Sequence, residues 1–145
     1  MSMLRLRDDM GIDDFKRRGA GFLPGETGIE VVAVGQGEVR SRLNIERRHM
    51  APNGFLHAAT VVALADTSCG YGTIAHQPEG SISFTTIELK ANFLGTVRDG
   101  SVVCTARLEH GGRTTQVWSA EVADEANGNR IALFRCTQMI LWPRA

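Results

Sequence analysis

The stretch HAATVVALADTSCGYGTIAH spans residues 57–76. Its first half is rich in small and apolar residues that are compatible with a helix. Asp66 is its only formally charged side chain, and a helix that is apolar on nearly all sides is a buried helix. The glycines of residues 70–72 (GYG) are expected to weaken its second half. The stretch therefore predicts one buried helix that carries a single carboxylate.

The segments on both sides of this helix have the composition and period of β-strands. Residues 29–34 are rich in β-branched side chains, and residues 38–47 alternate, with Val39, Leu43 and Ile45 on one side. A period of two indicates a strand with one buried face. Four further strands are predicted after the helix, at residues 82–94, 101–109, 114–123 and 130–142.

The strands after the helix are separated by short breaks that contain Gly, Asn or Asp. Gly111-Gly112 and Asn127-Gly128-Asn129 suit hairpins, because Gly and Asn tolerate positive φ. Strands joined by short turns favour an antiparallel sheet. One face of the predicted strand at residues 114–123 is expected to consist of Gln116, Trp118, Ala120 and Val122.

One buried helix against an antiparallel sheet is an α+β architecture. Residues 1–145 are expected to form a single domain, in which a curved sheet wraps around one long central helix. Residues 1–24 form an N-terminal extension in this prediction, with a short helix over residues 8–18. The glycines and Pro24 that follow are expected to break regular structure.

Charge, cysteines and apolar runs exclude several partners and locations. Sixteen basic residues balance sixteen acidic ones, which gives no electrostatic case for nucleic acid or an anionic membrane. Three cysteines without a C-x-x-C spacing indicate buried thiols in a reducing compartment. No signal peptide and no apolar run of the ~20 residues needed by a membrane helix are visible. We therefore expect a cytoplasmic protein.

Motifs for metals and nucleotides are missing from the sequence. The four histidines form neither an i,i+4 pair nor a Cys/His cluster, so we expect no metal site. G-x-G-x-x-G, P-loop and G-x-S-x-G patterns do not occur, which argues against nucleotide-dependent and serine-hydrolase chemistry. We expect no cofactor.

The segment HMAPNGFLHAATVVALADTSCGYG, residues 49–72, resembles the hotdog thioesterases of the phenylacetate-degradation type, within the 4-hydroxybenzoyl-CoA thioesterase superfamily. Those proteins show a His, an Asn two residues on, a Gly, then His-Gly-Gly opening the central helix and Leu-Ala-Asp on it. The matching positions here are His49, Gly54, His57 and Leu64-Ala65-Asp66. The strand at residues 85–94, the Gly112-Arg113 turn and the last strand extend the resemblance to about residues 25–142.

Two positions depart from the family pattern. Ala51 stands where the family carries Asn, and an Asn occurs two residues later, at Asn53. The Gly-Gly pair is replaced by Ala58-Ala59, which narrows the room beside the start of the helix because Ala has a Cβ that Gly lacks.

The resemblance implies a hotdog fold and hydrolysis of an acyl- or aryl-CoA thioester to the free acid and coenzyme A, with coenzyme A as part of the substrate. Asp66 would be the catalytic carboxylate, as general base for a water or as nucleophile. A carboxylate on a buried helix is costly unless it is paired or functional, and burial should raise its pKa. The alternatives are an Asp that caps a second helix segment or binds a neighbouring hydroxyl.

The start of the helix supplies the other half of the expected site. Helix N-terminal N–H groups lack intrahelical partners, so the Ala58 N–H is a candidate to stabilise an oxyanion. Asn53 is a second candidate donor, with a simple Pro-Asn-Gly turn as the alternative. His57 is expected near the helix N-cap, either as a structural hydrogen bonder or as a base.

Other candidates depend on the resemblance. Thr86 lies where related thioesterases often carry a Ser or Thr that holds the attacking water. Coenzyme A phosphates need a cation, for which Arg113, Lys90 and Arg98 are candidates.

His57 and Asp66 are nine residues apart, which is half a turn out of phase and ~13 Å along a helix axis. The family solves this with sites shared between subunits. We therefore expect a homodimer or homotetramer, with Ala58 and Asn53 of one subunit facing Asp66 and Thr86 of another.

Two other functions remain open on the sequence alone. A hotdog dehydratase or hydratase acting on β-hydroxyacyl thioesters would use a catalytic His, which residues 49–54 match only loosely. A non-catalytic acyl-CoA-binding module is favoured by Ala51 and Ala58 and disfavoured by Asp66.

Overall fold

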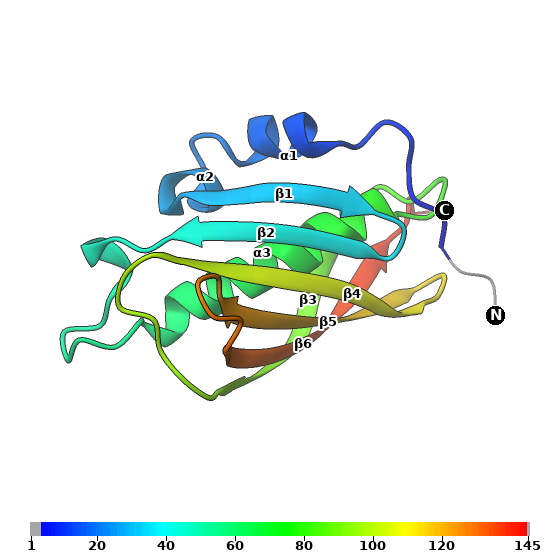
Figure 1. The fold of residues 1–145 in the computed structure, drawn as a ribbon. Coiled ribbons are helices and arrows are strands. Elements are labelled where there is room, and N and C mark those ends of the chain that lie inside the picture. Colours follow the sequence, from blue (N-terminus) through cyan, green and yellow to red (C-terminus); the bar gives the residue numbers. More distant parts are fainter. Residues whose placement is uncertain (1–3, 145) are drawn as a thin grey trace.

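The computed structural model describes residues 4–144 and has the predicted α+β architecture, a six-stranded antiparallel sheet around the helix α3 (Ala58–Ala75) (Figure 1). Residues 1–3 of the predicted extension, and residue 145, lie outside the described residues. The strand order is β1-β2-β4-β5-β6-β3, so β1 and β3 are the edges. The strands are β1 (Ile29–Gly35), β2 (Glu38–Asn44), β3 (Ser83–Phe93), β4 (Ser101–Gly111), β5 (Thr115–Asp124) and β6 (Arg130–Leu141).

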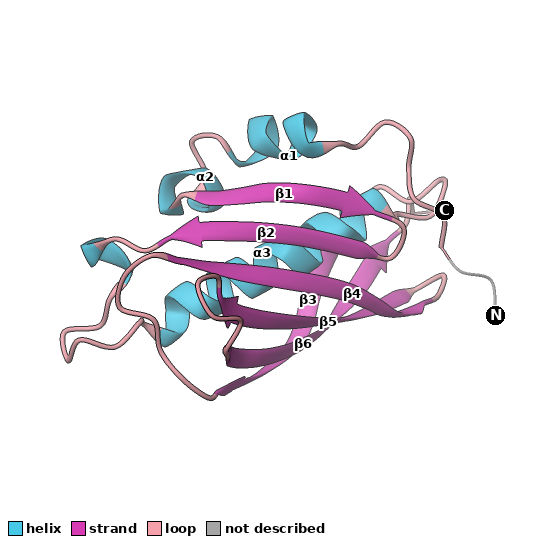
Figure 2. Ribbon diagram, in the orientation of Figure 1, coloured by secondary structure: helices cyan, strands magenta, loops and turns pink. Residues whose placement is uncertain are grey.

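The inner face of the sheet curves around α3 (Figure 2). Burial alternates along the central strands, as the period of two predicted. The predicted inner face of β5 is confirmed, because all four of its side chains are buried: Gln116, Trp118, Ala120 and Val122.

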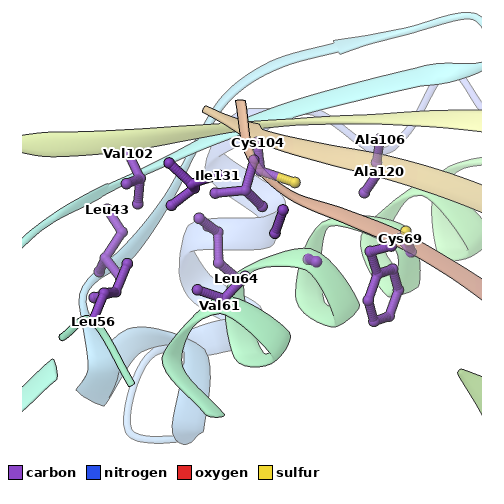
Figure 3. Packing of buried hydrophobic residues seen from close by; sticks show 14 of the residues in the cluster. Leu43, Leu56, Val61, Leu64, Cys69, Val102, Cys104, Ala106, Ala120 and Ile131 are labelled. Carbon is purple, nitrogen blue, oxygen red and sulfur yellow. The ribbon is translucent and has the colours of Figure 1, made fainter. Parts of the chain in front are cut away.

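The core lies between α3 and this inner face. Figure 3 shows Val61, Leu64 and Cys69 of the helix pointing toward the strands. Burying each large apolar side chain contributes roughly 1.5–3 kcal/mol, so this contact holds helix and sheet together. The strand residues that meet them include Leu43, Val102, Cys104, Ala106, Ala120 and Ile131.

The second half of α3 does not weaken, and that expectation was wrong. The helix runs unbroken through residues 70–72 to Ala75. A Cβ on Gly72 would lie 2.5 Å from Cη2 of Trp118, and one on Gly70 would lie 3.3 Å from Cζ of Phe84. The glycines let the aromatic rings approach the helix backbone, and that packing outweighs their propensity cost of about 1 kcal/mol each.

The N-terminal extension contains two short helices rather than one. The helix α1 (Ile12–Gly19) begins later than predicted, where the Gly11 N–H donates to Asp14 Oδ2 at 2.7 Å. The expected break after it was wrong in part, because α2 (Leu23–Thr27) forms there. Pro24 is tolerated in its first turn, where its missing N–H costs no intrahelical bond.

These helices cover the β1 edge and the end of α3 (Figure 1). Phe15 of α1 is buried and stacks on Tyr71 of α3, with ring centroids 4.5 Å apart. A turn of 3₁₀ helix, η1 (Arg47–His49), precedes α3. None of the helices within residues 4–144 has the length and apolar character needed to cross a bilayer.

The Gly72 contact can be tested by adding a methyl group. Gly72→Ala should destabilise the protein by about 1–3 kcal/mol in denaturant unfolding, because overpacking against Trp118 exceeds the gain in helix propensity. Gly35→Ala is the matched control, since a Cβ there meets nothing within 4 Å. Equal stabilities of the two variants would contradict the proposed close packing.

Candidate active site

Asp66 lies in the middle of α3 on the side that faces β3. Its carboxylate is half-buried, and the Thr86 hydroxyl lies 3.4 Å from its Oδ1 atom. Burial raises the pKa of Asp66 above its ordinary value, and the Thr86 hydrogen bond opposes this with a smaller effect. The carboxylate is therefore more basic than one in water, as expected from its place on an apolar helix.

Thr86 reaches Asp66 from β3, in the same subunit. A bulge between Thr86 and Glu88 interrupts the β3–β6 register at this point. Bulges of this kind bend a strand and re-aim a side chain. The Thr86 hydroxyl donates to Gln138 Oε1 at 2.6 Å, and Gln138 is fully buried on β6.

Gln138 is a residue that the sequence did not single out. It stands directly opposite Thr86 in the β3–β6 pairing. The only available signal was its position, because an alternating β6 pattern puts residue 138 on the same face as Phe134 and Cys136. A polar residue on a buried strand face needs a partner, and here that partner belongs to the site.

The start of α3 has the predicted arrangement around His57. His57 is the N-cap, and its Nδ1 atom accepts from the Ala59 N–H at 2.9 Å. The N–H groups of Thr60 and Val61 reach the His57 carbonyl. Within residues 4–144, the Ala58 N–H has no acceptor, so it is available to a ligand.

A pocket of about 350 Å³ adjoins the Ala58 end of the helix. It is mostly apolar and open to solvent on one side, as expected for part of a ligand site. Its lining consists of Phe55, Leu56, Ala58, Val61, Phe93, Gly95 and Thr96.

Asn53 lies in the loop beside this pocket and is exposed. Its Oδ1 atom accepts from the Phe55 N–H at 3.3 Å, which is an Asx-turn contact. Gly54 follows with a φ of +87°. The structure thus gives Asn53 a role in the turn.

The three basic candidates do not gather in one subunit. Arg98 donates to the Gly54 carbonyl at 3.1 Å and lies over the Phe55 ring, beside the pocket. Arg113 lies over the Trp142 ring at the β4–β5 turn, at the opposite end of the sheet (Figure 1). Lys90 is exposed on β3.

Asp66→Asn should raise the thermal unfolding midpoint at pH 7. The folded state raises the pKa of Asp66, so folding stability falls as pH rises through that pKa. At neutral pH the ionised carboxylate therefore costs stability, and a neutral amide removes that cost. The gain should vanish below about pH 4, where Asp is protonated in the unfolded chain as well.

The control for this measurement is Asp99→Asn, because Asp99 is exposed in the β3–β4 connection. It should change the midpoint little at either pH. An equal rise in both variants would show a general charge effect rather than the burial of Asp66.

Comparison with known proteins identifies the family of this chain. The sequence profile of the thioesterase superfamily matches residues 53–130. A 1,4-dihydroxy-2-naphthoyl-CoA hydrolase of Listeria monocytogenes is 33% identical over 110 residues, which are 76% of this chain and 88% of that protein. A 1,4-dihydroxy-2-naphthoyl-CoA hydrolase of Escherichia coli is 29% identical over 85% of this chain and 89% of its own.

Solved structures show the same fold. A thioesterase from Haemophilus influenzae superposes with a TM-score of 0.88 at 26% identity, over 96% of this chain and 95% of its own. The E. coli PaaI protein of the phenylacetic acid degradation operon superposes with a TM-score of 0.74 at 19% identity, over 81% and 83%. The resemblance and the fold predicted from the sequence are both confirmed. The chain belongs to the thioesterase superfamily and is a thioester hydrolase of the hotdog fold.

Proposed function

We propose that this thioesterase cleaves its substrate with Asp66 as the catalytic carboxylate and the Ala58 N–H as the oxyanion donor. The observation that carries the proposal is the half-buried Asp66 beside the Thr86 hydroxyl. The family and the CoA hydrolases among the relatives confirm the predicted acyl-CoA thioesterase activity. Both hydrolases are named for an aromatic acyl group, which favours an aryl-CoA substrate here.

The reaction needs one water and no metal. Asp66 takes a proton from the water while the water oxygen attacks the carbon of the thioester carbonyl. The negative charge that develops on the carbonyl oxygen is stabilised by the Ala58 N–H and the positive end of α3. The C–S bond then breaks, and the departing thiolate takes the proton from Asp66. The Thr86 hydroxyl favours the general-base role over the nucleophile, because it gives the water a second partner.

Two subunits are required because the two groups are far apart on one helix. Residues 57 and 66 differ by half a turn and ~13 Å along α3. The β3 edge is a suitable dimer contact, since its exposed apolar side chains would otherwise face water. These are Ile87, Leu89 and Phe93, exposed by 51%, 43% and 49%.

Antiparallel pairing of two β3 strands about their midpoint brings the two half-sites together. It places the Phe93 end of one strand beside the Thr86 end of the other. Phe93 lines the pocket of Ala58, and Thr86 contacts Asp66. Each dimer would thus contain two sites, each with Ala58 from one subunit and Asp66 from its partner.

The same pairing of β3 strands brings the candidate coenzyme A-binding cations of the two subunits toward one site. Arg98 lies beside the pocket of its own subunit, whereas Arg113 lies at the sheet end that approaches the partner's pocket. Arg98, Arg113 and Lys90 are therefore proposed to surround coenzyme A from both subunits. Two such dimers can associate further into a tetramer. The free thiols of the three buried cysteines support a cytoplasmic location.

The dehydratase alternative is disfavoured by the state of His49. This residue is buried, its Nδ1 atom accepts from the Glu46 N–H at 2.9 Å, and its Nε2 atom lies 2.7 Å from the Thr27 carbonyl. Both ring nitrogens are engaged in structural hydrogen bonds, so neither is free for proton transfer to a substrate.

Asp66→Asn should lower kcat at least ~10²-fold, because the amide cannot take a proton from water. The measurement is thiol release from aryl-, short-, medium- and long-chain acyl-CoAs. Wild-type turnover should fall as pH drops through the raised pKa of Asp66, since only the ionised form is a base. Tight acyl-CoA binding without thiol release by the wild type would instead support a binding module.

A mixing experiment tests the shared site. Ala58→Pro removes the N–H and should lower turnover roughly 10²–10³-fold. His57 has a φ of −65° and a ψ of 135°, which suits the residue before a proline. Mixing this variant with Asp66→Asn should restore about a quarter of wild-type activity, because half the dimers are mixed and each contains one intact site.

Ala58→Gly is the matched control, because it retains the N–H and should keep wild-type turnover. Light scattering should show a dimer or tetramer for each protein. Mixed variants that exchange subunits yet stay inactive would contradict the shared site.

A further inference from the structure

Three polar side chains form a row across the otherwise apolar inner face of the sheet. Thr86 on β3 pairs with Gln138 on β6, and Gln138 pairs with Gln116 on β5. Both glutamines are fully buried. Such groups are costly in a core unless their hydrogen bonds are made, so the partner of each amide atom is informative.

Gln116 is fixed by two partners. Its Nε2 atom donates to the His76 carbonyl at 3.2 Å, and its Oε1 atom accepts from the indole N–H of Trp118 at 2.8 Å. Gln138 differs, because its Oε1 atom accepts from Thr86 while its Nε2 atom has no partner. It is the one buried side-chain nitrogen or oxygen without a hydrogen bond in the part of the chain that the structure describes.

The Thr86 hydroxyl has a single hydrogen and two candidate acceptors. One is Gln138 Oε1 at 2.6 Å, and the other is Asp66 Oδ1 at 3.4 Å. When the hydrogen points at Gln138, only oxygen lone pairs face the Asp66 carboxylate. That arrangement leaves the carboxylate without a donor and the Gln138 N–H groups without an acceptor.

A half-turn of the Gln138 amide resolves both problems with the same heavy-atom positions. Nε2 then donates to Thr86 Oγ1, and the hydroxyl hydrogen is free for Asp66. A hydrogen bond to a carboxylate is stronger than one to a neutral carbonyl, so ionisation of Asp66 favours this orientation. The second lone pair of Thr86 remains available to accept from the attacking water.

We propose that Gln138 is a positioning residue that orients the Thr86 hydroxyl as a donor to ionised Asp66. The inference rests on the proposed role of Asp66 as general base. Gln138 does not touch the substrate in this arrangement and acts through Thr86. Its Nε2 atom donates to Thr86 Oγ1, so that the hydroxyl hydrogen of Thr86 points at Asp66.

Few other groups can influence the charge of Asp66. The titratable side chain whose charge couples to that of Asp66 is the thiol of Cys69 on α3, and contact with Cys136 of β6 together with burial raises the pKa of Cys69. The Cys69 thiol is therefore neutral at working pH. The charged residues of β3 and β6 are all exposed and comprise Glu88, Lys90, Arg130 and Arg135.

The test measures kcat/KM against pH for the acyl-CoA that the wild type turns over best. Gln138→Met keeps the side-chain length but removes both hydrogen-bonding atoms. It should shift the acidic limb, which is the fall of kcat/KM at low pH, to a pH about one unit higher. It should also lower kcat roughly tenfold at neutral pH, with little change in KM. Thr86→Val should move the limb in the same direction, whereas Thr86→Ser should keep the wild-type limb.

Non-additivity separates positioning from a general loss of stability. The double variant Gln138→Met/Thr86→Val should be no worse than Thr86→Val alone, because Gln138 acts only through Thr86. Gln116→Met is the matched control, since it removes the other buried amide of the row. It should lower thermal stability yet leave the acidic limb in place. Gln138→Leu serves if the Met variant does not fold.

The inference would be overturned if the acidic limb of the Gln138→Met profile coincided with that of the wild type. It would also be overturned if the reductions in kcat of the two single variants added in the double variant. A titration of the Asp66 carboxyl carbon by ¹³C NMR gives the same answer without turnover. If the wild type hydrolyses no acyl-CoA, the proposed function fails, while this titration still decides whether Gln138 controls the Asp66 proton.

Discussion

At Gly72 the central helix α3 approaches the sheet so closely that the Trp118 ring leaves no room for a side chain. The Trp118 ring occupies the space that a Cβ at Gly72 would need. Its indole N–H is bonded to Gln116, which in turn holds the carbonyl of His76 at the end of the helix. The packing of Trp118 against Gly72 fixes the axial position of α3 on β5. It thereby places Asp66 over the β3–β6 pair.

Curvature of the sheet then brings β3 to the helix. Bulges interrupt the register in four of the five strand pairs, and each bulge increases the local twist. The bulge after Thr86 has a direct chemical consequence, because it lies where the strand passes Asp66. The same local distortion therefore closes the sheet around the helix and sets a hydroxyl beside the carboxylate.

How much the sequence predicts depends on how local each signal is. Asp66 stands out because a lone charge on an apolar helix is a local anomaly, and the alternation around Trp118 gives the inner face of β5. The helix through residues 70–72 was misjudged, because the packing that favours those glycines comes from other elements: Phe84 of β3 lies against Gly70, and Trp118 of β5, 46 positions away, lies against Gly72. Gln138 was missed for the same reason: its partner Thr86 lies 52 residues earlier in the chain. Local patterns cannot show that β3 pairs with β6.

The edge position of β3 accounts for the proposed division of the site between two subunits. Asp66 is only half-buried because β3 is an edge strand, and no further strand among residues 4–144 lies beyond it. In the proposed dimer, the partner's β3 and helix start fill that side and remove water from the carboxylate. Removing water raises the basicity of Asp66 further and strengthens the attraction between the Ala58 N–H and a developing oxyanion. In the proposed dimer, assembly and catalysis use the same edge, because the surface that pairs the subunits also excludes water from the site.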